Sequence, residues 1–151
     1  MTKREKRFLS SGGERGQSLV ETALVFPVLI TMLVGAVEMA RVARASIAVA
    51  NAAKAGAQYG GESGFTAQDS TGIATAASNE ASTLSVTTSS SVACSCSDGS
   101  ASTCLNSDCS NSHIEETLTV NTQSTVNASI RLPGLPTSFT VKGQSIQRVV
   151  Q

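Results

Sequence analysis

The sequence predicts an α+β protein in which a long amino-terminal helix precedes a small antiparallel sheet. Three observations predict this fold: an apolar and then alanine-rich stretch covers residues 17–59, apolar and polar residues alternate in later segments, and four cysteines lie at the end of one of those segments and in the connection to the next. The whole chain carries 11 basic and 11 acidic residues. This balance disfavours nucleic-acid binding, because neutralising phosphates requires a basic excess.

The first 16 residues form a basic leader before an apolar span. Five Lys or Arg residues stand against Glu5 and Glu14, which leaves a charge of about +3. The next 21 residues, 17–37, contain one charged side chain, Glu21, and would form about 30 Å of helix, the thickness of one hydrocarbon core. The basic flank predicts a single pass through the membrane, with the amino terminus in the cytoplasm and the carboxyl-terminal part outside.

The helix is expected to continue beyond the membrane. Alanine dominates residues 40–57, so the sequence predicts an exposed helical extension over about 38–59. Glu38 and Arg41 lie three residues apart and can pair at the outer boundary of the membrane. Ala36 and Ala40 would allow another helix to approach closely. The alternative is an alanine-rich helix that packs only against its own globular domain.

Glu21 is the unusual residue of the apolar span. A carboxylate near the start of a membrane helix is costly unless it stays at the headgroup level or finds a counter-charge. Gly16 precedes it by five residues. If the chain were cut after Gly16, Gln17 would carry a new amino terminus, and this amine could pair with the Glu21 carboxylate of a neighbouring subunit in a packed filament.

These residues resemble a known family. The basic leader, Gly16 and the following Gln-Ser-Leu-Val-Glu have the layout of a type IV prepilin signal, whose peptidase cuts after the glycine. The stretch GQSLVETALVFPVL at 16–29, with Gly35, Glu38 and Arg41, resembles the TadE-like family of minor pseudopilins in tight-adherence (Flp) pilus systems. The resemblance implies a minor or initiating subunit in pilus biogenesis, at the inner membrane, and leaves open whether it enters the fibre.

The same resemblance implies partners. They are prepilin peptidase, other pilin or pseudopilin subunits, the inner-membrane assembly platform and membrane lipid. An enzyme is not expected, because the sequence contains no Gly-rich phosphate loop, no His-Glu-x-x-His and no Gly-x-Ser-x-Gly. No cofactor and no metal are expected either.

Two other classes of protein remain open at this stage. One is a signal-anchored surface or adhesion protein that does not polymerise. The other is a secreted, disulfide-rich binding module, released by a conventional signal peptidase that would cut after Ala45 or Ala50. The charges of Glu38, Arg41 and Arg44 crowd that cleavage region and disfavour it.

Residues 60–151 are expected to form a small α+β head outside the cytoplasm. A short helix is predicted at about 67–82, with an amino-terminal cap near Thr66. Apolar residues then fall on even positions at 84–96 and again at 114–132, as in half-buried antiparallel strands. A third strand is predicted at about 139–150. Its apolar phase changes between Val141 and Ile146, which predicts a bulge near Gly143.

The four cysteines are expected to staple this head. The predicted outside location favours disulfides. A bond between Cys94 and Cys96 is disfavoured, because both would point to the same side of one strand. Each is therefore expected to pair with Cys104 or Cys109, and the spacing leaves both combinations open. A zinc site that adds His113 is the alternative, but the spacing is unlike a usual zinc knuckle, and His113 is expected to be an exposed residue at a loop edge.

Overall fold

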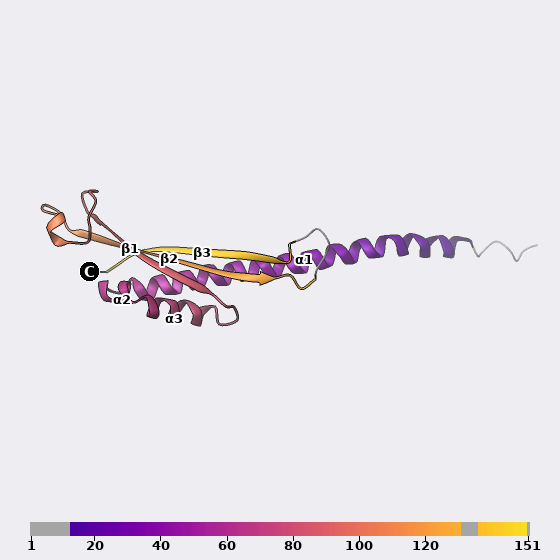
Figure 1. Ribbon diagram of the computed structural model, residues 1–151. Coiled ribbons are helices and arrows are strands. Elements are labelled where there is room, and N and C mark those ends of the chain that lie inside the picture. Colours follow the sequence, from indigo (N-terminus) through magenta and orange to yellow (C-terminus); the bar gives the residue numbers. More distant parts are fainter. Residues whose placement is uncertain (1–12, 131–135, 151) are drawn as a thin grey trace, which may run out of the picture. The chain divides into compact units, whose positions relative to one another are not determined.

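The structure, a computed structural model, describes residues 13–130 and 136–150 (Figure 1). The leader predicted at 1–16 therefore lies largely outside the described residues. The chain divides into two compact units, Met1–Met39 and Ala40–Gln151. Helix α1, Gly13–Gly60, has 48 residues and contributes to both. It supplies every described residue of the first unit and the first 21 residues, 40–60, of the second.

The second unit is a head built from helices and one sheet. After α1 come helix α2 (Gly64–Gln68) and helix α3 (Ser70–Glu80). Strand β1 (Thr87–Cys96), a 3-10 turn η1 (Asn106–Asp108), strand β2 (Ile114–Asn127) and strand β3 (Ser138–Arg148) complete it. The sheet has the order β1-β2-β3 with both pairs antiparallel, which confirms the predicted fold class.

The single short helix predicted at 67–82 is two helices in the structure. Ser63 caps α2 in a capping box with Thr66, and Asp69 caps α3 by accepting a hydrogen bond from the Gly72 amide. The cap predicted near Thr66 is therefore displaced: Thr66 is the third residue of a short helix, not its cap. Several hydroxyl and carboxylate side chains near this point could cap a helix, so composition alone does not single out Ser63 and Asp69.

The alternation in β1 and β2 places even-numbered side chains on the inner face, as predicted. Leu118 and Val120 of β2 are fully buried, and Cys96 of β1 is nearly so. Ala57 of α1 and Ile73 of α3 pack against this face of the sheet. Ala52 of α1 packs on α3 in a separate cluster, and Figure 1 shows α2 and α3 alongside the second half of α1 with the strands beside it.

The prediction of a bulge near Gly143 is wrong. Strand β3 pairs with β2 in one continuous register, from Thr117 opposite Arg148 to Asn127 opposite Ser138. Ile146 simply faces outward and is 62% exposed. Gly143 serves a different purpose: a Cβ built on it would lie 2.7 Å from the carbonyl oxygen of Val49 and 2.9 Å from the Ala50 Cα. The glycine lets the backbone of α1 approach the sheet.

The exposed extension predicted over 38–59 is largely part of the core of the head. Val49, Ala52, Ala53 and Ala57 are completely buried, and Ala45 is nearly so. The Thr122 hydroxyl of β2 donates a 2.8 Å hydrogen bond to the Val49 carbonyl oxygen, which ties this part of α1 to the sheet. Residues 45–60 therefore pack against the head of their own chain, which is the alternative that the sequence left open.

Candidate functional site

The candidate site is the apolar part of α1 that lies in the first unit. From Gly16 to Leu33 every residue is exposed, including Leu24 at 72%, Met32 at 70% and Leu33 at 66%. Helix α1 contains a window with a mean hydropathy of 2.1, so it is long and apolar enough to cross a membrane. Large side chains of this kind are stable only when lipid or other protein covers them, because each costs about 1.5–3 kcal/mol to leave in water.

The helix satisfies its own polar groups along this segment. The Thr22 hydroxyl donates to the Ser18 carbonyl oxygen at 2.9 Å, and the Thr31 hydroxyl donates to the Pro27 carbonyl oxygen at 2.8 Å. Pro27 lies inside the helix without ending it. Hydroxyls that bond back to the preceding turn need no external partner, which suits a segment surrounded by hydrocarbon.

Gly16, Gln17 and Glu21 all lie on this helix. Each is exposed, and a Cβ on Gly16 would meet nothing within 4 Å. The Glu21 carboxylate forms no ion pair or hydrogen bond with any residue that the structure describes. It borders a shallow surface hollow of about 260 Å³, lined otherwise by Thr22, Val25, Phe26 and Leu29. The geometry therefore presents one carboxylate on an apolar helix surface, open to a partner outside the chain.

Glu38 and Arg41, the expected boundary pair, lie where one unit ends and the other begins. Glu38 is half-buried and Arg41 is exposed. The Arg41 guanidinium donates a hydrogen bond to the Ser129 hydroxyl, just after β2. This contact, 88 residues apart in the chain, was not expected from the sequence. The pairing of Arg41 with Glu38 stays a prediction.

The cysteines form two disulfides at the end of the sheet where β1 and β2 are joined. Cys94 pairs with Cys104, and Cys96 pairs with Cys109, with Cα–Cα distances of 5.2 and 5.6 Å. All four thiols are consumed, so none remains as a thiolate ligand for the zinc alternative. Cys96 and Cys109 are buried with Ile114, whereas Cys104 is exposed. Cys104 also adopts a left-handed backbone conformation, with φ of 70°.

Two carboxylates organise the loop that the disulfides close. Asp98 accepts hydrogen bonds from the Ser100 hydroxyl at 2.6 Å and the Ser100 amide at 2.9 Å, and these bonds lower the pKa of Asp98. Asp108 accepts from the hydroxyl and the amide of Thr103, both at 2.7 Å, and its pKa is lowered for the same reason. These carboxylates therefore hold turns in place.

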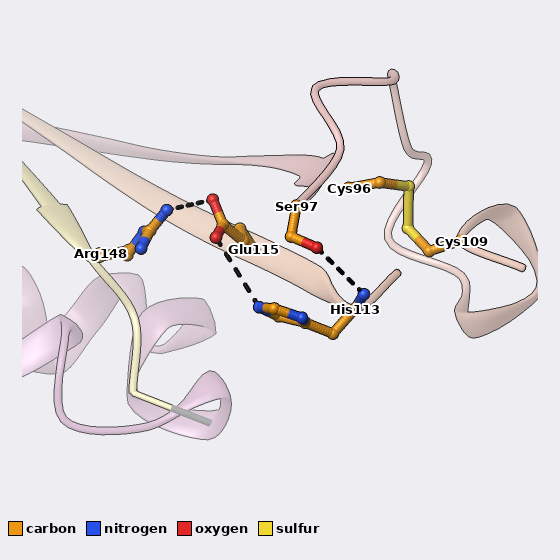
Figure 2. Close-up of polar contacts among 6 residues, drawn as sticks. All are labelled: Cys96, Ser97, Cys109, His113, Glu115 and Arg148. Atoms are coloured by element: carbon orange, nitrogen blue, oxygen red, sulfur yellow. Dashed lines mark hydrogen bonds and ion pairs between the residues drawn. A yellow bond between two sulfur atoms is a disulfide. The ribbon is translucent and has the colours of Figure 1, made fainter. Parts of the chain in front are cut away.

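A charged cluster lies at the base of the same loop (Figure 2). Glu115 of β2 accepts a hydrogen bond from the Arg148 guanidinium of β3, and its other oxygen lies 3.8 Å from His113 Nε2. Figure 2 also shows the Cys96–Cys109 disulfide of this loop and the His113 amide, which donates to the Ser97 hydroxyl. The His113 side chain is 74% exposed, as expected for a residue at a loop edge.

The described residues hold no group of three or more His, Cys, Asp or Glu side chains that could bind a metal ion. One polar contact that sequence reasoning missed connects α1 to α3. The Tyr59 hydroxyl donates to the Asp69 carboxylate at 2.9 Å. Together with the bond from the Gly72 amide, this contact lowers the pKa of Asp69, and it raises the pKa of Tyr59. Tyr59 lies near the end of α1 and Asp69 caps α3, so the contact depends on the path of the chain between these helices and not on a repeat within one element.

An apolar helix that can cross a membrane, joined to a small disulfide-bonded head, defines a membrane-anchored protein with a single candidate span in the described residues. Residues 16–58 match the family model described as TadE-like protein. Over these residues the chain is similar to TadE-like proteins of tight-adherence pili. The match lies within α1 and includes no residue of the head after this helix. No curated protein and no solved structure matches the chain.

Proposed function

We propose that this protein is a minor pseudopilin, processed by prepilin peptidase, that acts in the assembly of a tight-adherence pilus. One observation carries the proposal. Glu21 is a lone carboxylate on an exposed apolar helix surface, five residues after a glycine whose neighbourhood is sterically open. Cutting after Gly16 would create an amine at Gln17, and pairing between that amine and Glu21 of a neighbouring subunit would offset both charges within a packed helix bundle.

The exposed side chains of 16–33 support assembly through helix packing. In the membrane, lipid covers them, and in a filament, the corresponding helices of other subunits would cover them. Pilin or pseudopilin subunits and the inner-membrane assembly platform are the partners proposed for this surface. The role proposed for the chain itself is structural and not catalytic.

The head supports an orientation with the amino terminus in the cytoplasm. Two disulfides join residues 94–109, and such bonds persist on the oxidising side of a bacterial membrane. The basic leader is expected on the opposite, cytoplasmic side. We therefore place the head in the periplasm or outside the cell, where it would contact the growing pilus.

The cleavage is tested with two glycine variants. An alanine Cβ at Gly16 or at Gly35 would meet no atom within 4 Å, so alanine fits at both sites without a clash. We expect intact-mass spectrometry of membrane-extracted protein to show a mature chain that begins at Gln17. Gly16→Ala should retain the leader, and Gly35→Ala should be processed like the wild type. A wild-type chain that keeps residues 1–16 would refute the processing and favour the signal-anchored surface protein.

The pairing is tested with two glutamate variants. Glu21→Gln keeps the size of the side chain and removes its charge, and Glu80→Gln does the same at an exposed position in α3. We expect Glu21→Gln to abolish or strongly reduce pili counted by electron microscopy while the protein still reaches the membrane, and Glu80→Gln to leave pili unchanged. Normal piliation in Glu21→Gln would contradict the proposed charge pairing.

A further inference from the structure

The outer face of the sheet, opposite the helices, is unusually rich in hydroxyl and amide groups. The odd-numbered side chains of β1 and β2 and the even-numbered side chains of β3 point to this face, and most of them are exposed. No helix or strand among the described residues covers it. Most of its side chains are Ser, Thr, Asn or Gln, and it has no aromatic ring.

A hollow of about 530 Å³ lies in this face, and we call it the outer-face groove. Its walls are two rows of side chains that run across the three strands in register. One row is Thr87, Gln123 and Lys142, and the other is Ser89, Asn121 and Gln144. Thr122 and Gly143 also line it, but the Thr122 hydroxyl bonds to the helix side, so these two contribute mainly backbone.

The register gives the groove a regular array of hydrogen-bonding groups. Neighbouring strands lie about 4.8 Å apart, and residues two apart along a strand are separated by about 6.7 Å. The two rows therefore cover an area of about 7 by 10 Å. Within it, the Gln144 amide donates to the Asn121 side-chain oxygen at 2.9 Å, which holds both amides in place. The Asn121 amide hydrogens and the Gln144 carbonyl oxygen remain available to a ligand.

One side chain determines the charge of the groove. Lys142 is the one charged residue in its lining, and no carboxylate lines it. The nearest outer-face carboxylate along β2, Glu115, is already bonded to Arg148. Lys142 forms no ion pair with any residue in the described parts of the chain. An uncompensated ammonium group beside five neutral hydrogen-bonding side chains is complementary to a ligand with many hydroxyls and sparse negative charge.

We propose that the outer-face groove binds an acidic polysaccharide, with Lys142 on a uronate carboxylate and the Asn121–Gln144 pair on sugar hydroxyls. A nucleic acid fits less well, because it requires several cations and favours aromatic stacking platforms. A neutral glycan would leave Lys142 without a partner. This binding would be an activity of the head and does not depend on cleavage of the leader or on pilus assembly.

The experiment is a calorimetric titration of the full-length protein in detergent micelles. The probe is an oligogalacturonate, compared with the same oligomer after full methyl esterification, which removes the charges and keeps the sugar ring. We expect the wild type to bind the acidic oligomer about tenfold more tightly than its ester, because a hydrogen bond to a charged group is worth about a factor of ten or more. In Lys142→Gln, this preference should disappear.

Two further variants separate the groove from general surface charge. Lys54→Gln removes another exposed lysine, on α1 and away from the groove lining, and should bind both oligomers like the wild type. Asn121→Ala should weaken the binding of both oligomers about fivefold, since it removes a contact to hydroxyls that both oligomers contain. The proposal is overturned if the wild type binds neither oligomer, if Lys54→Gln and Lys142→Gln lose affinity equally, or if inorganic phosphate displaces the acidic oligomer at similar concentration.

Discussion

Residues 16–39 and 40–60 belong to one helix, yet their apolar side chains are exposed in the first segment and largely buried in the second. The first segment carries large side chains such as Leu24 and Leu33, and it leaves them exposed. The second carries mainly alanine and glycine, and it buries Val49, Ala52 and Ala57 against its own sheet and α3. Hydrophobicity alone therefore did not decide which segment joins the core.

Side-chain size explains the difference. A sheet and a helix backbone can approach closely where the facing residues are small, and Gly56 and Gly60 of α1 and Gly143 of β3 mark such approaches. A Cβ on Gly60 would lie 2.3 Å from Leu118 Cδ2, closer than two non-bonded carbon atoms can be. The larger residues of 16–33 could not pack at this distance, so they need lipid or another subunit. Small residues therefore mark the part of α1 that packs against its own head, and large residues mark the part that other molecules must cover.

The largest expected effect separates the two segments with one charged substitution in each. Val49→Asp places an unpaired carboxylate at a completely buried position and should destabilise the head by about 4 kcal/mol or more. Leu29→Asp lies at an exposed position of the first segment and should leave the thermal unfolding of the head unchanged while it reduces membrane insertion. Circular dichroism and membrane fractionation measure the two effects. Equal loss of head stability in both variants would break the comparison.

The next effect tests the close approach of helix and sheet. In Gly143→Ala the added methyl group would collide with the backbone of Val49 and Ala50, which cannot move aside as a flexible side chain would. We expect a loss of about 1–3 kcal/mol, measured by chemical denaturation. Gly35→Ala, at a sterically open position of the first segment, is the matched control and should cost nothing. An unchanged midpoint in Gly143→Ala would mean that the two backbones are not in contact.

A smaller effect is expected from removing either of two threonine hydroxyls that both donate hydrogen bonds to carbonyl oxygens of α1. Thr122 is 2% exposed and donates to Val49, whereas Thr31 is exposed and donates to Pro27 within the helix. Thr122→Val should destabilise the head by about 1 kcal/mol, because a buried carbonyl loses a partner. Thr31→Val should not change the unfolding temperature of the head. The comparison would be weakened if both substitutions had the same effect.

The smallest effect concerns the end of the second segment, where Tyr59 bonds to Asp69. Because the bond helps to lower the pKa of Asp69, its contribution is fully present above the ordinary carboxyl pKa of about 3.9 and is lost as the pH falls through the lowered pKa. Tyr59→Phe should therefore lower the unfolding temperature slightly at pH 7, and the difference from the wild type should shrink as the pH falls through the lowered pKa of Asp69. Asp98 is a pH control: its lowered pKa does not involve Tyr59, so the acid dependence it contributes should persist in the variant.

Much of the fold could be predicted because it is encoded by local periodicity. The long apolar run indicated α1, and the alternation on even positions identified the inner faces of β1 and β2. The third strand was located correctly but its phase was misread. Between Val141 and Ile146 the apolar positions change from odd to even numbers, as they would across a bulge. In the structure the strand has no bulge, and Ile146 lies on the outer face of the sheet.

For the candidate site, the sequence named residues but not the contacts between them. The sequence singled out Gly16, Glu21 and the four cysteines, and it limited the disulfides to two combinations. It could not choose between those combinations, because Cys104 and Cys109 lie in a loop whose path depends on the turns held by Asp98 and Asp108. It also missed the contact of Arg41 with Ser129 and the array of the outer-face groove, which join residues distant in the chain.

The sequence by itself determined that the amino-terminal segment is one long helix, which side of each of the first two strands is apolar, and where a charge interrupts the membrane-length span. These properties follow from composition and spacing within a few turns of the chain. Only the tertiary structure decided that residues 45–60 pack on their own head, that Cys94 pairs with Cys104, and that Gly143 is a contact point and not a bulge. Each of these depends on the distance between backbones far apart in the chain, and local patterns carry no measure of that distance.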